Sequence, residues 1–152
     1  MALPNIYTPE TTEITLKRLE NLKATSQPKW GKMNAAQMLA HLNVAYDLAF
    51  EKTKSNPSFI IKLMMKLFIK NVIVSEKSYQ KNSRTAPEFI IANERDFEKE
   101  KSLYIQNIKE TEKKGLAYFE GKSNSSMGKL TAIEWNNMFY KHTNHHFEQF
   151  GI

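Results

Sequence analysis

Residues 131–151 read TAIEWNNMFYKHTNHHFEQFG, and this stretch carries the clearest fold signal in the chain. Thr131 followed three residues later by Glu134 is a capping box, in which two side chains satisfy free backbone amides at the start of a helix. Gly151 is typical of the residue that follows a helix, because glycine readily adopts a left-handed backbone conformation. Apolar residues recur at helical spacing between these two signals. We therefore predict a helix that ends at about Phe150.

This predicted helix contains three of the four histidines of the chain, His142, His145 and His146. An α-helix turns ~100° per residue, so residues four apart lie on one face. His142 and His146 have this spacing, which is also that of helical zinc ligands. By the same rotation, His145 falls at the edge of this face. The residues within about 60° of His142 are Trp135, Met138, Phe139, His146 and Gln149.

A second helix is predicted from Asn34 to about Lys52. Asn34 followed by Gln37 resembles another capping box. His41, the fourth histidine, lies on a broad apolar face of this helix and therefore points to the same interior as the other histidines. The inward stripe consists of Met38, Leu42, Ala45 and Ala49.

Imidazoles from the two helices would form a three-nitrogen site of His41, His142 and His146, with His145 as an alternative ligand. Three protein nitrogens leave positions open for water or substrate, which is the pattern of catalytic metal sites. Neutral imidazole suits Zn, Ni, Cu or Fe, and the residue types do not choose among them. The competing interpretation is a set of hydrogen-bonded core histidines, because helical spacing also arises by chance and the helix dipole favours histidine near a C-terminus.

The remaining helices also have recognisable ends. Thr8 is placed to cap a helix that starts at Pro9, a residue suited to the first helical position. Gly115 is predicted to stop another helix, with Asn93 as its cap. Together with apolar periodicity, these signals predict helices over residues 9–23, 59–74 and 94–114.

Two loops separate the predicted helices. Residues 75–93 have weak periodicity, with a weak strand candidate at residues 89–91, and loops of this length often serve as lids or binding loops. Residues 121–129 form the second loop. We therefore expect an all-α four-helix bundle with the longer loop between the third and fourth helical segments. The chain has the length of one domain, so residues 1–152 are predicted to form a single bundle domain.

The amino-acid composition excludes several classes of function. The absence of cysteine removes disulfides, thiolate metal ligands and cysteine nucleophiles. The start of the chain does not resemble a signal peptide, and no apolar run approaches the ~20 residues that span a bilayer. We expect a cytoplasmic protein without a membrane span. The net charge of +6 favours encounters with polyanions, but its lysines are dispersed among glutamates, which is typical of a solvated surface.

The faces of two predicted helices raise the question of a membrane or protein partner. Lys62, Lys66 and Lys70 recur every four residues in an apolar segment, and such basic amphipathic helices lie on membranes or bind partners. We favour the alternative, a core helix with one solvated lysine face, because a bundle needs such a helix. The last helix has a second apolar side, which is either buried in the same chain or packs against a second subunit, so a homodimer is a hypothesis. This side consists of Ile133, Tyr140 and Phe147.

The chain resembles a DinB-like family branch of unknown function over nearly its whole length. The resemblance rests on residues 30–42 (WGKMNAAQMLAHL), 81–89 (KNSRTAPEF), 128–135 (GKLTAIEW) and 140–151 (YKHTNHHFEQFG). It implies a DinB/YfiT-like four-helix bundle with up-down-down-up topology.

The resemblance also implies a site. Related members use one histidine of the second helix and an HxxxH pair of the last helix as metal ligands, which correspond to His41, His142 and His146. Some members are transferases or isomerases that use bacillithiol, mycothiol or glutathione. Many relatives carry a His-Pro pair before the glycine of the closing motif, where this chain has Ser125-Ser126-Met127, so a role for that histidine does not carry over.

Three functions follow as hypotheses. The first is a metal-dependent transferase or hydrolase that acts on a small electrophile, with Zn, Ni or Fe and a low-molecular-weight thiol as cofactors. Arg84 and Trp30 are its candidate substrate-binding residues, with Arg84 as an anion anchor. The second is a non-catalytic basic module with structural histidines, although the chain lacks a helix-turn-helix signature and a base-stacking platform, so we do not expect nucleic acid as a partner. The third is a metal carrier without turnover.

Overall fold

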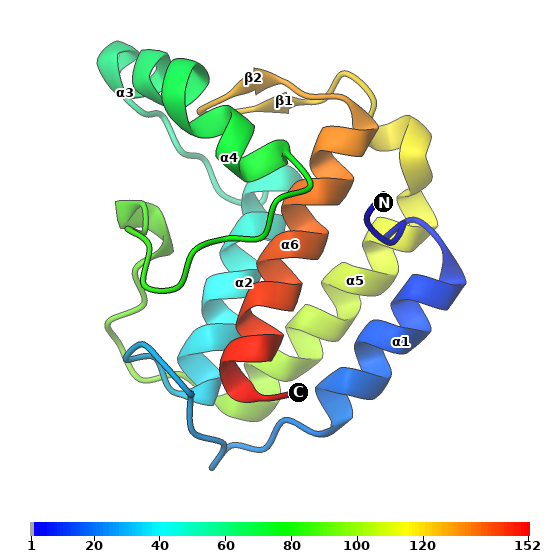
Figure 1. Ribbon diagram of the computed structural model, residues 1–152. Coiled ribbons are helices and arrows are strands. Elements are labelled where there is room, and N and C mark those ends of the chain that lie inside the picture. Colours follow the sequence, from blue (N-terminus) through cyan, green and yellow to red (C-terminus); the bar gives the residue numbers. More distant parts are fainter. Residues whose placement is uncertain (1) are drawn as a thin grey trace.

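The computed structural model describes residues 2–152, and most of this range is helical (Figure 1). The predicted mainly helical fold is confirmed, and within residues 2–152 the sheet is limited to one short antiparallel hairpin that the sequence pattern did not indicate. The elements are α1 (Pro9–Glu20), α2 (Ala35–Ala49), α3 (Phe59–Met64), the π-helical turn η1 (Met65–Ile69), α4 (Lys70–Val74), the 3-10 turn η2 (Pro87–Phe89), α5 (Phe97–Phe119), β1 (Ser123–Asn124), β2 (Gly128–Lys129) and α6 (Ala132–Phe150).

The two capping boxes are present as predicted. The Thr131 hydroxyl accepts a hydrogen bond from Glu134 N, and the Glu134 carboxylate accepts one from Thr131 N. Asn34 and Gln37 make the equivalent pair at the start of α2. Gly151 adopts the left-handed conformation after α6, with a φ of 75°. Local contacts therefore begin both helices that carry histidines, although α2 ends a turn earlier than predicted.

The predicted cap of α5 is wrong, and that of α1 is confirmed in position only. Asp96, and not Asn93, caps α5, because its carboxylate accepts a hydrogen bond from Lys99 N. A carboxylate at this position also interacts favourably with the helix dipole. Thr8 does precede α1, but its hydroxyl donates to the carbonyl of Asn5 and leaves the helix without a side-chain cap.

Gly115 interrupts α5 without ending it. Its backbone φ of 68° and ψ of 177° are not helical, so the regular helix breaks there as predicted. A further helical turn follows, which the sequence pattern did not indicate. This turn forms because it carries Phe119 into the core, where its ring contacts those of Trp135 and Phe139.

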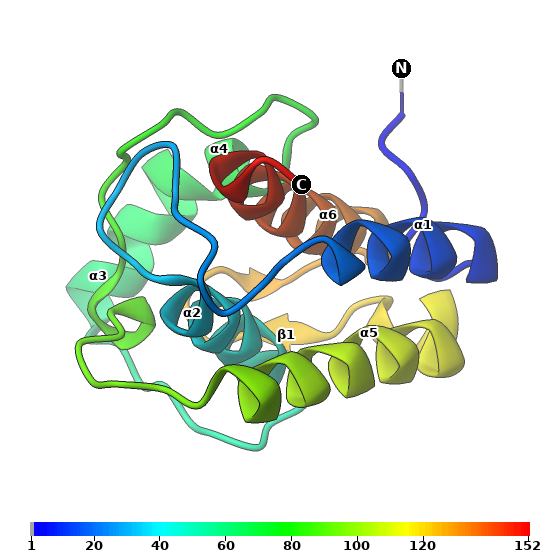
Figure 2. The same ribbon diagram turned by 90° about the horizontal axis from the view of Figure 1, so that it is seen from below.

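The four longest helices of the described chain, α1, α2, α5 and α6, lie side by side around one apolar core (Figures 1 and 2). Helix α2 contacts α5 and α6, and α5 also contacts α1 and α6. Aromatic rings fill the centre, where Tyr46 of α2 stacks on Phe139 of α6 with ring centroids 4.5 Å apart. This packing holds α2 against α6 and brings their histidine-bearing faces together.

The second apolar side of α6 is covered by the chain itself only in part. Phe147 is fully buried, and the ring of Tyr104 and the guanidinium of Arg18 lie against it. Ile133, at the start of α6, is exposed. Tyr140 is partly buried. The predicted second side is therefore buried at Phe147 but not at Ile133, and the homodimer stays a prediction.

The predicted helix over residues 59–74 is present as α3, η1 and α4, but the prediction that it is a core helix is wrong. The core is already enclosed by α1, α2, α5 and α6, so most apolar side chains of this segment face solvent. Met65, Ile73 and Val74 do contact the core. We call residues 59–74 the exposed arm. None of the helices described for residues 2–152 is both long and apolar enough to cross a bilayer.

Candidate metal centre

His41 is held in α2 with its ring directed to α6. Its Nδ1 lies 2.8 Å from the carbonyl oxygen of Phe89. Because a carbonyl can only accept a hydrogen bond, Nδ1 carries the hydrogen. In the neutral imidazole, Nε2 then keeps its lone pair, and this is the atom that faces the other histidines.

His142 and His146 project from one face of α6 toward His41. The ring centroid of His41 lies 4.8 Å from that of His142 and 4.6 Å from that of His146, and the two α6 rings are 5.0 Å apart. One nitrogen from each of the three rings lies within 4.8 Å of the other two. Nitrogens that bind one metal at ~2.0–2.1 Å are about 2.9–3.4 Å apart. The convergence predicted from sequence is therefore present, and the three nitrogens lie close enough to hold one cation.

Gln149 orients His146. Its Oε1 lies 2.7 Å from His146 Nδ1, and its Nε2 donates to the carbonyl of Trp30 at 2.6 Å. If the side-chain amide of Gln149 were flipped, its oxygen would face the carbonyl oxygen of Trp30, and neither atom can donate a hydrogen bond. The Trp30 carbonyl therefore fixes the orientation of the Gln149 amide. His146 Nδ1 must then donate, which leaves its Nε2 as the ligand atom. Such outer partners fix the tautomer and raise the basicity of a metal-binding imidazole.

The loop between α1 and α2 holds Gln149 in place. The backbone N–H of Lys29 donates to the carbonyl of Gln149 at 2.7 Å. Gly31 has a φ of 82°, and a Cβ at this position would lie 2.6 Å from Gln149 Nε2. Glycine is therefore required here for both its backbone conformation and its lack of a side chain.

A family model described as a protein of unknown function, DUF1569, matches residues 9–151. The chain belongs to the DUF1569 family. The matched range includes His41, His142 and His146, and also Gln149. No curated protein and no solved structure matches the chain.

Burial keeps the three imidazoles of this DUF1569 protein neutral. It lowers the pKa of His41 below 6.5 and lowers the pKa of His146 to about 3. Burial also holds the pKa of His142 well below 6.5, and the neighbouring His41 and His146 lower it further. Neutral imidazole is the form that binds a metal. At neutral pH the three rings are therefore in the state that a cation needs.

Phe89 covers the histidine cluster of this DUF1569 protein. Its ring centroid lies 5.5 Å from that of His41 and 6.0 Å from that of His142. Phe89 ends η2 within the long connection between α4 and α5, part of which crosses in front of α6 in Figure 1. The predicted loop over residues 75–93 thus contacts the cluster, and the weak strand candidate at residues 89–91 is wrong, because this stretch leaves η2 without pairing.

His145 lies beside the cluster in the DUF1569 fold. Its ring centroid is 5.1 Å from that of His146, and its other ring neighbours are Trp30 at 5.8 Å and Tyr79 at 6.0 Å. Among the described residues, the group with converging ligand atoms contains His41 and His146 but not His145. His145 therefore lies between the cluster and the aromatic residues of the two neighbouring loops.

The two predicted substrate-binding residues have different surroundings. The indole Nε1 of Trp30 is buried and has no hydrogen-bond partner among residues 2–152, while Lys81 Nζ lies 4.4 Å from the ring centroid. Arg84 is exposed on the long loop.

Sequence reasoning missed the orienting roles of Gln149 and the Phe89 carbonyl. Gln149 was already on the histidine face, but no residue type signals a backbone carbonyl.

Proposed function

We propose that this protein is a metal-dependent enzyme whose divalent cation is held by His41, His142 and His146. The observation that carries the proposal is the convergence of three neutral imidazole donors from two helices. An all-nitrogen donor set favours Zn, Ni or Fe over Mg or Ca. Held by these three imidazoles, such a metal would lower the pKa of a water or thiol and so supply a nucleophile at neutral pH.

The residues around the cluster have separate parts in this proposal. Gln149 and the Phe89 carbonyl hold two of the imidazoles in the ligand tautomer. The Phe89 ring covers His41 and His142 and limits the access of bulk water. The unused indole N–H of Trp30 suits a polar atom of a substrate or thiol cofactor, and the exposed guanidinium of Arg84 suits an anionic group.

The DinB-like resemblance supports the reaction class. On this basis we propose a thiol-dependent S-transferase or a hydrolase, in which a thiol or water attacks a small electrophile and the leaving group departs. We also propose that α1, α2, α5 and α6 form a DinB-like bundle of up-down-down-up topology, and that residues 1–152 make one such domain.

Metal analysis of the untagged protein tests the proposed site. We expect about one equivalent of Zn, Ni or Fe in the wild-type protein, and loss of this metal in His142→Ala. His145→Ala is the matched control, because His145 lies on the same helix but outside the converging group. Circular dichroism checks that both variants keep their helical content. If the wild-type protein binds none of these metals after reconstitution, the histidines are structural and the basic binding module becomes the better proposal.

A turnover assay separates an enzyme from a metal carrier. The metal-loaded protein is incubated with an epoxide or alkyl halide, with and without bacillithiol or glutathione, and the loss of free thiol and of electrophile is measured. Faster consumption with the wild-type protein than with His142→Ala supports the enzyme. Metal binding without any acceleration over the uncatalysed reaction would identify a carrier.

A further inference from the structure

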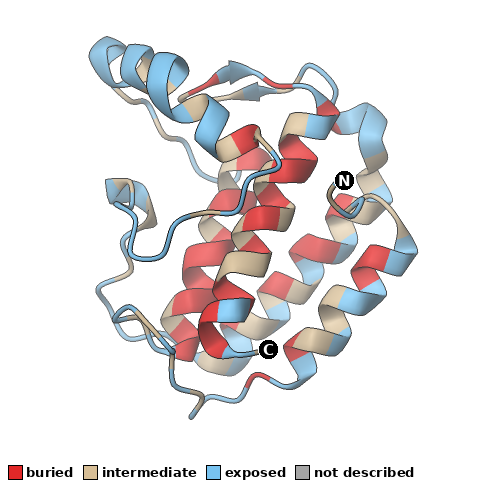
Figure 3. Ribbon diagram, in the orientation of Figure 1, coloured by how far each residue is buried: buried red, intermediate tan, exposed pale blue. Residues whose placement is uncertain are grey.

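Most of the exposed arm is coloured as exposed in Figure 3, and its exposed apolar residues form two rows. Residues within each row are four apart and therefore lie on the same side of the helix. The exposed fractions are 79% for Phe59, 69% for Ile60 and 68% for Phe68, which are far from core values. Contiguous apolar surface of this kind marks an interaction or membrane site. The rows consist of Phe59, Leu63 and Leu67, and of Ile60, Met64, Phe68 and Val72.

The arm is anchored to α6 at its C-terminal end. Lys141 Nζ donates to the carbonyls of Val72 and Ser75, each at 2.7 Å. The Asn137 side chain donates to the carbonyl of Val74 at 2.9 Å. From this anchor the arm extends outward to α3, away from α2 and α6 (Figure 1). The exposed rows therefore belong to a helix whose C-terminal end is fixed to α6.

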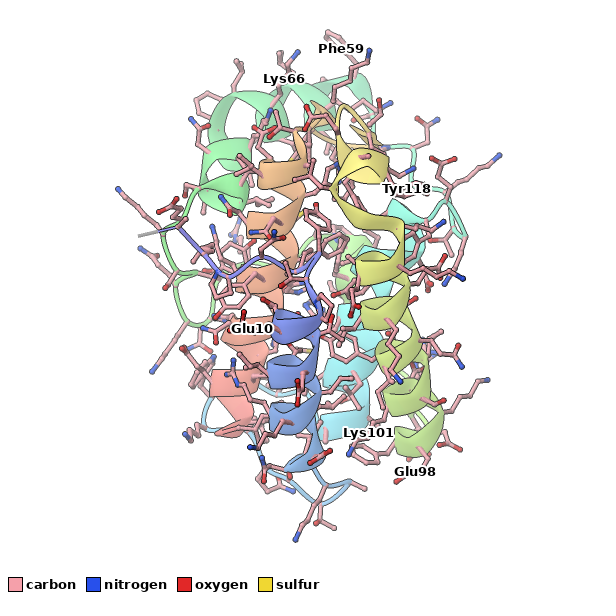
Figure 4. The ribbon with its side chains drawn as sticks, turned by 90° about the vertical axis from the view of Figure 1, so that its right-hand side faces the viewer. Glu10, Phe59, Lys66, Glu98, Lys101 and Tyr118 are labelled. Carbon is pink, nitrogen blue, oxygen red and sulfur yellow. The ribbon has the colours of Figure 1, made fainter. Side chains whose placement is uncertain are left out.

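The charge along the arm has one sign. Residues 59–74 contain three lysines and neither aspartate nor glutamate. Lys62, Lys66 and Lys70 follow one side of the arm, and Lys70 is paired with Glu134 of α6 at 2.9 Å. Lys66 is exposed and lies at the same end of the molecule as Phe59 (Figure 4). An apolar face beside a lysine row is the composition of helices that lie in a membrane interface.

We propose that the exposed arm docks the protein on the surface of an anionic phospholipid bilayer. Its apolar rows enter the boundary between headgroups and acyl chains, while Lys62 and Lys66 contact lipid phosphates. The alternative binding partner of the exposed arm is a second copy of this chain. Two arms packed together would bring their lysines close, and residues 59–74 contain no acidic residue to pair them, so like charges disfavour this partner. The inference does not depend on a metal at the histidine cluster.

Vesicle flotation with the full-length protein tests the proposal. One set of vesicles is phosphatidylcholine alone, and the other is equal parts phosphatidylcholine and phosphatidylglycerol. We expect flotation with the anionic vesicles only, and weaker binding as salt rises. Ile60→Ser/Phe68→Ser should abolish flotation, and Lys62→Gln/Lys66→Gln should weaken binding about fivefold per lysine.

The matched control carries the same kinds of change on α1, at Ile14→Ser/Lys17→Gln, where both side chains are also exposed. This control should float like the wild-type protein, and all variants should keep the wild-type unfolding temperature because the replaced side chains are exposed or only partly buried. Absence of flotation with anionic vesicles overturns the proposal, as does flotation that the arm variants leave unchanged. A dimer in light scattering that Ile60→Ser/Phe68→Ser converts to a monomer would assign the arm to a second copy instead.

Discussion

The Nε2 atoms of His41 and His142 lie 2.8 Å apart, although 101 residues separate the two histidines in the chain. Nδ1 of His41 donates to the Phe89 carbonyl, so Nε2 of the neutral ring has no hydrogen. In the metal-free protein, His142 Nε2 therefore donates to His41 Nε2. A cation would replace this shared hydrogen, and the two nitrogens are already near the spacing of ligands on one metal.

Replacement of Gln149 by leucine should weaken metal binding. The variant removes the acceptor of His146 Nδ1 and the link to the Trp30 carbonyl, so the imidazole loses its fixed orientation. Loss of such a partner typically costs about 10–100-fold in metal affinity. Competition with a chromophoric chelator measures the dissociation constant. Gln106→Leu, at an exposed position of α5, is the control, and equal affinity in the two variants would contradict the orienting role of Gln149.

Gly31→Ala should be more harmful than Gly121→Ala. The two glycines have φ values of 82° and 70°, so alanine costs roughly 1–2 kcal/mol of left-handed strain at either position. The Cβ of an alanine at position 31 would lie 2.6 Å from Gln149 Nε2, whereas the Cβ of an alanine at position 121 would meet no other atom within 4 Å. Urea unfolding should therefore show a larger loss for Gly31→Ala, with weaker metal binding in that variant alone. Matching losses would mean that Gln149 moves aside at no cost.

The metal-free protein should lose stability as the pH falls below about 6.5. Burial lowers the pKa of His146 to about 3 in the folded state, so between these pH values the unfolded chain binds a proton that the folded chain does not. Stability then rises with pH across this window, by up to about 1.4 kcal/mol per pH unit for one histidine, and is independent of this group above it. Urea unfolding from pH 4 to 8, after removal of metal, measures this slope. His146→Gln should show a shallower slope than the wild-type protein, and identical slopes would refute the buried neutral state.

Lys141→Met should loosen the anchor of the exposed arm. Lys141 is only 4% exposed, and burial lowers its pKa to about 8. Methionine is an unbranched side chain one atom shorter than lysine, and it cannot donate to the carbonyls of Val72 and Ser75. A buried polar group without its partner costs about 1–3 kcal/mol. We expect a loss of unfolding free energy in this range and faster amide exchange over residues 70–75. Lys17→Met on α1 is the control, and unchanged exchange in Lys141→Met would show that other contacts hold α4.

The sequence by itself determined the features that depend on residues three or four positions apart. The capping boxes at Asn34 and Thr131 formed as predicted, because a cap satisfies backbone amides of its own first turn. His142 and His146 share a face because helical rotation sets their relative direction. The convergence of His41 with them followed from the apolar stripes of two helices, since a shared core turns both stripes inward.

Only the tertiary structure decided which predicted faces are covered. Phe147 and Phe68 both lie on apolar faces in the sequence pattern, yet Phe147 is buried by α1 and α5 while Phe68 is 68% exposed. The roles of Gln149 and the Phe89 carbonyl likewise arise from contacts with loops far away in the chain. Periodicity states which side of a helix is apolar, but burial depends on whether another element reaches that side, and this is settled by packing across the whole chain.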